Sequence, residues 1–158
     1  MVKTGKILAA AVIIGCFFIF PAGAQSAWTR ADLQSIYMEH LRLEGYVPSI
    51  DVDGDILFKV SGDNFFIIID ENDLQFFQIY TGFSLGSVSA ENAFIAANFS
   101  NRRSKVAKVA ISSDGKVASI TAELLLSSPL DFAPVFARSL SLMRNAENNF
   151  LTYLNGLE

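Results

Sequence analysis

Hydrophobic residues recur at helical spacing in three segments of the chain, and the first segment begins at Thr29. A threonine followed three residues later by an acid, here Asp32, is typical of a helix N-terminus with a capping box. Gly45 can adopt the left-handed backbone conformation that ends a helix. The residues on one face between these points are Leu33, Ile36, Tyr37, His40 and Leu41. We therefore expect a first helix that packs this face against a core.

The other two helical segments lie further along the chain. One begins near Ser87 or Ser89 and runs to about Arg103, and the residues on its stripe are Phe94, Ala97, Asn98 and Asn101. In the last segment Asp131 is the expected N-cap, which leaves Pro134 in the first turn, where its missing N–H is not needed. The apolar stripe of this last helix comprises Phe132, Phe136, Leu140, Met143, Ala146, Phe150 and Leu154.

Between the helices the hydrophobic pattern changes to the alternation that is typical of strands. The expected strands are residues 56–60, 64–69, 74–81, 106–112 and 116–126. Asp114 and Gly115 join the last two, and this dipeptide favours a tight hairpin turn. The order is helix, three or four strands, helix, two strands, helix. We therefore expect an α+β fold, with an antiparallel sheet of five to six strands and three helices.

The lengths of the turns predict how the strands pair. The expected pairs are Val60 with Phe65, Phe58 with Ile67, Ile56 with Ile69, Leu74 with Ile69, Phe76 with Ile67, Ile111 with Ala118 and Val109 with Ile120. A slip of one residue would turn every side chain of a strand to the opposite face, so these pairs define which face carries the core.

The second face of the sheet is the first candidate functional surface. The expected registers place Leu57, Phe66, Ile68, Phe77 and Ile79 on it, and its polar continuation on the last hairpin comprises Lys108, Ser119, Thr121 and Glu123. An uncovered apolar patch of this kind marks an interaction surface, for a second copy of the chain or for another protein. The alternative is that a helix folds over it.

Asn98 and Asn101 extend the stripe of the second helix and are further candidates for partner binding. Their amides either satisfy backbone groups where the helix meets the sheet or make polar contacts with a partner in a groove.

The stretch DVDGDILF sets Asp51, Asp53 and Asp55 around Gly54. An EF-hand calcium loop needs glycine at position 6 and glutamate at position 12, and counting from Asp51 glycine stands at position 4 and Gly62 at position 12. We interpret the stretch as a hairpin with the three-residue loop Asp53–Asp55, which pairs Val52 with Ile56 and Ile50 with Phe58 and exposes both acids of that loop.

The sequence contains no recognisable catalytic or metal-binding motif. His40 is the single histidine and lies on an apolar helix face, and neither a G-x-S-x-G turn nor an HExxH pair is present. We therefore expect neither a catalytic residue, nor a metal ligand, nor a cofactor.

The N-terminal segment has the pattern of an export signal. Lys3 and Lys6 precede an apolar run from Ile7 to Phe20, and Pro21 and a small-residue cleavage site follow. We therefore expect cleavage after Ala24 and one domain over residues 25–158. The alternative is a lipidated N-terminus at Cys16. The chain has 16 Asp+Glu against 12 Lys+Arg and a formal net charge of −4, which disfavours a nucleic-acid partner. The export signal predicts a periplasmic or secreted location.

Three segments resemble the YbjN family: GYVPSIDVDGDILFKVSGDNFFIIIDENDLQFFQIY, AANFSNRRSKVAKVAISSDGKVASITAELLL and FARSLSLMRNAENNF. The resemblance implies a fold like that of type III secretion chaperones, which often dimerise and bind extended protein segments. It implies a role in bacterial sensory transduction, and neither an enzyme nor a cofactor. We expect an exported protein-binding or regulatory domain, with a sensor of a small apolar ligand as the alternative.

Overall fold

The first helix begins where Thr29 caps it. The computed structural model describes residues 28–157, and in it the N–H of Asp32 donates to Thr29 Oγ1 while the Asp32 carboxylate accepts from the Thr29 N–H. Helix α1 spans Arg30–Leu43, and Gly45 follows it with a φ of 88°. Leu33, Tyr37 and Leu41 are buried, so the expected face packs inward.

Helix α2 spans Ala90–Arg103 and begins at Ser89, one of the two expected starts. Of the expected stripe, Ala97 is buried, whereas Phe94 is 48% exposed. The buried residues of α2 are Ala93, Ala96, Ala97 and Ser100. These small side chains allow a close approach to the last helix, where the Ser100 hydroxyl donates to the carbonyl of Ala146 at 2.7 Å.

Helix α3 spans Ala133–Asn155 and carries Pro134 in its first turn, as expected. It is preceded by a short 3-10 helix, η1, over Pro129–Phe132. The N-cap is therefore not Asp131. Ser128 caps η1, and Asp131 completes a capping box there by accepting from the Ser128 N–H at 3.0 Å.

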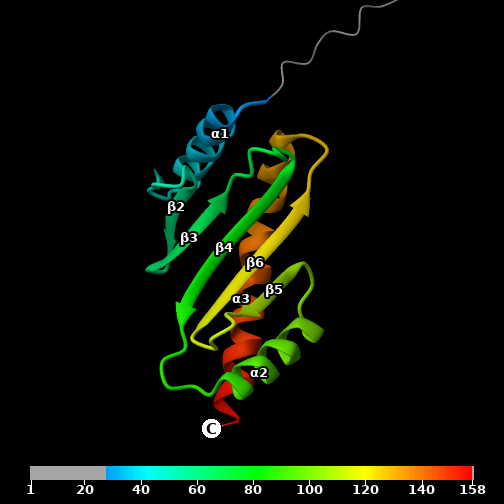
Figure 1. Cartoon of the computed structure of the whole chain (residues 1–158). Helices are drawn as coiled ribbons and strands as arrows, with labels where there is room; N and C mark the ends of the chain where they lie inside the picture. The colour runs from blue at the N-terminus through cyan, green and yellow to red at the C-terminus, as the bar shows by residue number, and fades with distance from the viewer. Residues whose placement is uncertain (1–27, 158) are drawn as a thin grey trace, which may run out of the picture.

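The sheet has six strands in the order β1-β2-β3-β4-β6-β5, and all neighbours are antiparallel. The strands are β1 Ser49–Ile50, β2 Ile56–Val60, β3 Asp63–Ile68, β4 Phe76–Ser84, β5 Ala107–Ile111 and β6 Val117–Leu125. Figure 1 shows the strands in front of α3, with α2 beside the lower end of that helix. The expected α+β fold is confirmed.

The hairpin registers agree with expectation to different degrees. Val109 pairs with Ile120, as predicted from the Asp114–Gly115 turn. In the β2–β3 hairpin the turn is Ser61–Gly62, both at positive φ, so Phe58 pairs with Phe65 instead of Ile67. This shift of two residues leaves every side chain on its expected face.

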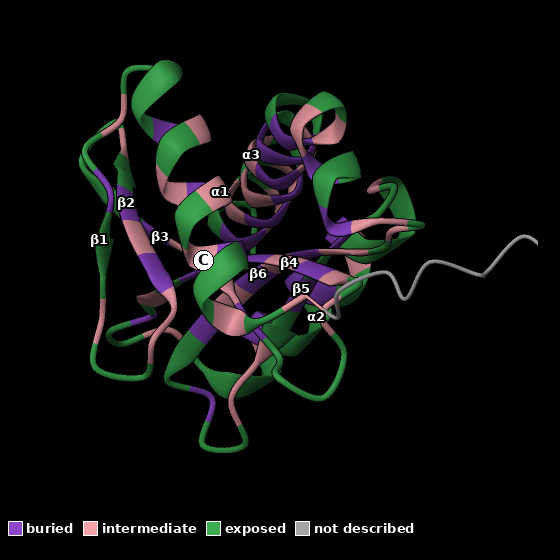
Figure 2. Ribbon diagram, turned by 90° about the horizontal axis from the view of Figure 1, so that it is seen from above, coloured by how far each residue is buried: buried purple, intermediate pink, exposed green. Residues whose placement is uncertain are grey.

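The core lies between the sheet and the helices. Figure 2 shows α1 and α3 on the same side of the sheet. Tyr37 of α1 packs against Phe132 at a ring-centroid distance of 4.7 Å and against Phe77 of β4 at 5.9 Å. The aromatic cluster therefore ties the first helix, the last helical segment and the central strand into one core.

Candidate functional site

One face of the sheet is open. Leu57, Phe66 and Ile68 lie on it and are half-buried, whereas Ile56 and Ile67, which point to the helices, are completely buried. No helix within residues 28–157 covers this face, and none of the side chains that the strands place on it is fully buried. Three of the five expected apolar residues therefore lie on an accessible surface.

Phe77 and Ile79 do not belong to this face, so their expected placement is wrong. Both are completely buried in the core, because Ile67 pairs with Ile79 and not with Phe76. The loop over residues 69–75 is longer than expected, and the three-residue displacement of β4 turns its side chains to the opposite face.

Phe76 and Tyr80 take the places of the two buried residues. Leu57 lies opposite Phe66, and Phe66 lies opposite Tyr80 with a ring-centroid distance of 6.0 Å, so an apolar row crosses three strands. The residues of this surface, which we name the apolar patch, are Leu57, Phe66, Ile68, Phe76 and Tyr80. Gln78 could have predicted the places of Phe76 and Tyr80. A polar residue inside β4 indicates the open face, and Phe76 and Tyr80 are each two residues from Gln78, so they lie on the same face.

The expected polar residues of the open face, Lys108, Ser119, Thr121 and Glu123, lie on its β5–β6 part. Lys108 of β5 donates to the carboxylate of Glu123 on β6 at 2.6 Å, and the Thr121 hydroxyl donates to the same carboxylate at 2.9 Å. The hydrogen bond from Lys108 is the main cause that lowers the pKa of Glu123 below its ordinary value. The apolar patch is therefore flanked by an ion pair whose two charges largely cancel.

Asn101 has a structural role at the outer edge of β5. Its Nδ2 donates to the carbonyl of Val109 at 2.9 Å, and its Oδ1 accepts from the Val109 N–H at 2.7 Å. Both polar atoms of the amide are thus engaged within the chain. Asn98 is exposed on α2. The structural interpretation therefore applies to Asn101, and partner binding stays a prediction for Asn98 alone.

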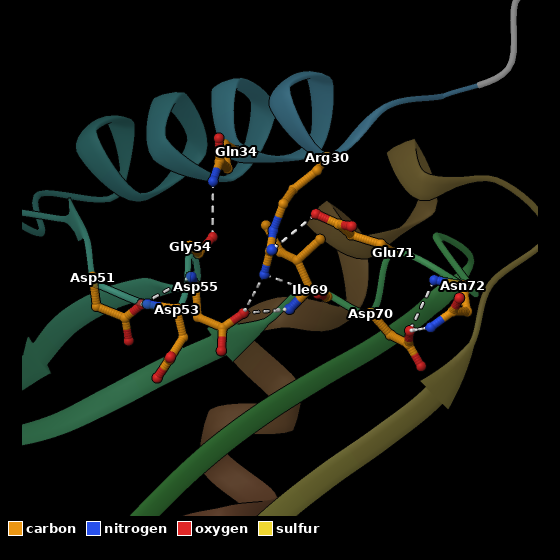
Figure 3. Close-up of polar contacts among 10 residues, drawn as sticks. All are labelled: Arg30, Gln34, Asp51, Asp53, Gly54, Asp55, Ile69, Asp70, Glu71 and Asn72. Carbon is orange, nitrogen blue, oxygen red and sulfur yellow. Dashed lines mark hydrogen bonds and ion pairs between the residues drawn. The ribbon is translucent and has the colours of Figure 1, made fainter.

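The acidic loop after β1 is held by its own carboxylates (Figure 3). Asp51 Oδ1 accepts from the N–H groups of Asp53 and Asp55, at 3.0 and 2.9 Å. Ile50 pairs with Ile56, so the loop runs over residues 51–55 and is longer than the expected three residues. Asp51 is a turn-forming residue of the kind that Asx-turns use.

Asp55 is not exposed, which corrects the expectation that it lies at the loop tip. Its side chain is 13% exposed, accepts from the N–H of Ile69 at 2.8 Å and lies 3.4 Å from the guanidinium of Arg30. Arg30 also donates to the carbonyl of Ile69 and to Glu71, and Gln34 donates to the carbonyl of Gly54 at 2.8 Å (Figure 3). These contacts join the start of α1 to two loops of the sheet. They explain the acidic loop without a bound ion.

His40 has aromatic neighbours. Its ring lies edge-on to Phe132 at 4.9 Å and to Phe136 at 5.1 Å, and its Nε2 is buried without a hydrogen-bond partner. A catalytic histidine needs a carboxylate or hydroxyl within hydrogen-bond reach. Among residues 28–157 no group of three or more His, Cys, Asp or Glu side chains is arranged to hold a metal ion. The contacts of His40 are therefore those of a histidine packed against the aromatic core.

Comparisons with known proteins agree with the expected resemblance at the level of the fold. No protein-family model matches the chain, and no curated protein matches it significantly. The crystal structure of YbjN from E. coli, described as a proposed transcription regulator, superposes with a TM-score of 0.55 over 75% of this chain and 89% of YbjN, at 11% identity. The chain has a YbjN-like fold.

A second crystal structure with the same fold is that of an uncharacterised protein from Methanothermobacter thermautotrophicus. It superposes with a TM-score of 0.50 over 77% of this chain and 94% of that protein, at 13% identity. Neither YbjN nor this protein is described as an enzyme.

The expected signal peptide over residues 1–24, with Cys16, lies outside the described residues. Within residues 28–157, no helix has both the length and the apolar character that a membrane crossing requires.

Proposed function

We propose that this chain is a non-enzymatic protein-binding domain and that the apolar patch is its binding surface. The observation that carries the proposal is the accessibility of Leu57, Phe66 and Tyr80, one continuous row on the open face. A contiguous exposed apolar surface of this kind marks a site that another protein covers when a complex forms. An interface with an apolar centre and a polar rim is the usual anatomy of a protein–protein contact.

The distribution of charged residues favours a second copy of the same chain as the partner that covers the apolar patch. The protein has a formal net charge of −4, so two copies repel each other over most of their surfaces. The open face is an exception, because its charged residues are Lys59, Lys108 and Glu123, and the last two form an ion pair. Two open faces can therefore meet without bringing unpaired carboxylates together.

A two-fold symmetric contact would place the apolar patch of each copy against that of the other. Such isologous contacts are the commonest arrangement of homo-oligomers. Leu125, on the open face at the end of β6, is 80% exposed and would lie at the rim of the contact. The polar β5–β6 half would then remain accessible to solvent.

The experiment is a measurement of oligomeric state over a series of concentrations, by sedimentation velocity or light scattering. We expect the wild-type protein to dimerise and the double variant Phe66→Glu/Ile68→Glu to be monomeric with an unchanged circular dichroism spectrum. Phe94→Glu is the matched control, since Phe94 is 48% exposed on α2, outside the open face, and its replacement should leave dimerisation unchanged.

Two results contradict the proposed self-association. One is a wild-type protein that stays monomeric at every concentration. The other is a double variant that dimerises as well as the wild type. A third result is a wild-type protein that is monomeric but captures a different protein, which the double variant does not capture. The apolar patch would then still be the binding surface, and its partner would be that protein and not a second copy.

We further propose that the protein acts after export, in the periplasm or outside the cell, with its signal removed after Ala24. Support comes from the lysines, apolar run and small-residue cleavage site of the first 24 residues. N-terminal sequencing of the protein from the periplasm should begin at Gln25. A mature protein that begins at Cys16 and loses its membrane association in Cys16→Ser would show lipidation instead.

A regulatory or chaperone-like role would operate through the same surface. YbjN is described as a proposed transcription regulator, but the acidic charge of this chain opposes contact with phosphate groups. We therefore propose that any regulation by this protein proceeds through protein contacts.

A further inference from the structure

A strained turn precedes the edge strand β5. The N–H of Ala107 donates to the carbonyl of Lys105 at 2.7 Å, and Val106 between them has a φ of 67°. This is a γ-turn with positive φ, which is rare and strained. A β-branched residue is an outlier in this region of backbone space. Strain of this kind clusters at binding sites, which makes the surroundings of Val106 informative.

The turn creates a step at the edge of the sheet. Strand β5 begins at Ala107, opposite Ala122, whereas β6 continues to Leu125. The last residues of β6, Glu123–Leu125, therefore pair with β4 alone. Next to this step a space lies between β6 and α3, since residues of both elements line it.

This space is a cavity of about 310 Å³ with mostly apolar walls. Leu124 from β6, Val106 from the turn and Leu142 from α3 contribute to the walls, and Val135 and Ser139 complete the α3 side. Its volume is at the lower end of the range in which small-molecule sites occur, about 300–1,000 Å³. The Ser139 hydroxyl donates to the carbonyl of Val135 at 2.9 Å, so its proton is engaged within the helix.

Two cationic side chains, Lys105 and Arg138, line the same cavity. Neither forms an ion pair with any residue in the part of the chain that the structure describes. In a chain with more acids than bases, two unpaired cations beside one apolar cavity form a local anion-attracting site.

We propose that this cavity binds a small amphipathic carboxylate, with an apolar tail against Leu124 and Leu142 and its carboxylate between Lys105 and Arg138. The apolar walls offer no partners to a ligand with a polar body, and the two cations match one anionic head group. A guanidinium and a carboxylate form strong charge-assisted hydrogen bonds. The site is separate from the apolar patch, so its occupancy and self-association can be tested independently.

The test uses octanoate as the probe and isothermal titration calorimetry of the purified protein. We expect octanoate to bind with one-to-one stoichiometry and octanol, which has the same tail without the charge, to bind about tenfold or more weakly. The double variant Lys105→Gln/Arg138→Gln should lose the preference for octanoate over octanol. The matched control is Lys116→Gln, because Lys116 is exposed beside the turn at the opposite end of the β5–β6 hairpin.

A second variant tests the cavity itself. Leu142→Trp fills the space from the α3 side and should abolish binding of both probes, with a thermal unfolding transition confirming that the variant is folded. The proposal is overturned if octanoate does not bind, if it binds equally well to the double variant, or if octanol binds as tightly. Binding of a short peptide with an apolar C-terminal residue, without binding of octanoate, would also overturn it.

Discussion

The side-chain amide of Asn101 forms with Val109 both of the hydrogen bonds that a neighbouring strand would form. Nδ2 donates to the carbonyl at 2.9 Å and Oδ1 accepts from the N–H at 2.7 Å. At the same edge the N–H of Ala107 is engaged by the carbonyl of Lys105. An unprotected edge strand is a template for pairing with other chains, so Asn101 protects β5 from such pairing.

Replacement of Asn101 by alanine should destabilise the protein by about 1–3 kcal/mol, since the two backbone groups of Val109 lose their partners. Urea unfolding followed by circular dichroism measures the loss. Asn98→Ala is the control, because Asn98 is exposed on the same helix, and it should change stability by less than about 0.5 kcal/mol. Equal effects of the two substitutions would contradict the role given to Asn101.

The acidic loop offers a matched pair in Asp55 and Asp53. Asp55→Ala removes the acceptor for the N–H of Ile69 and leaves Arg30 without that carboxylate, so we expect a loss of about 1–3 kcal/mol. Asp53→Ala should have little effect, because the Asp53 side chain is exposed. Chemical denaturation of both variants decides the point. A large effect at Asp53 would show that the loop, and not the contact with α1, carries the stability.

Gly115 is required for two reasons that can be separated by experiment. Its φ is 72°, and a Cβ at this position would lie 2.4 Å from the Cβ of Ala90 at the start of α2. Gly86 has a φ of 59° and nothing within 4 Å of a built Cβ. Gly86→Ala should therefore cost only the backbone term of about 1 kcal/mol, and Gly115→Ala should cost about 1–3 kcal/mol more from overpacking. Melting temperatures of the two variants provide the comparison, and similar values would contradict the steric contact.

Glu123 should contribute to acid sensitivity. The hydrogen bond from Lys108 lowers its pKa in the folded protein, so the contact stabilises the fold fully above the ordinary pKa of the carboxyl group. This contribution is lost as the pH falls through the lowered pKa. Stability measured between neutral pH and pH 3 should fall less steeply for Glu123→Gln than for the wild type. Parallel curves for the two proteins would contradict the coupling.

The features that sequence alone predicts correctly depend on residues that are close in the chain. Thr29 and Asp32 cap α1, and the Asp114–Gly115 turn leads directly to the pairing of Val109 with Ile120. Their signals are complete within a few residues, so no knowledge of the rest of the fold is needed.

The register of β4 could not be predicted in this way. Its segment FFQIY has apolar residues in both alternating sets, with Gln78 as its one polar residue, and the loop over residues 69–75 has no tight-turn signal that would define its length. The pairing of β4 with β6 sets the face instead, and that partner follows some 30 residues later in the chain. For this reason Phe77 and Ile79 were expected on the wrong face.

The residues of the candidate site also divide into those that local sequence places correctly and those that depend on distant contacts. Leu57, Phe66 and Ile68 could be placed from the local β2–β3 hairpin, since a shift of two residues does not change the face. The roles of Asp55 and Asn101 depend on where α1 and α2 dock on the sheet. Such contacts between distant elements leave no periodic trace in the sequence.

The nine-residue ladder between β4 and β6 also determines when the chain can fold. Phe77 and Ile79 of β4 acquire their neighbours on β6 only after Val117–Leu125 has been synthesised, and closure of this long loop must precede the gain from the pairing. A growing chain that has not reached β6 therefore lacks one of the two neighbours of the central strand β4. Completion of the sheet is therefore a late event in the synthesis of the chain.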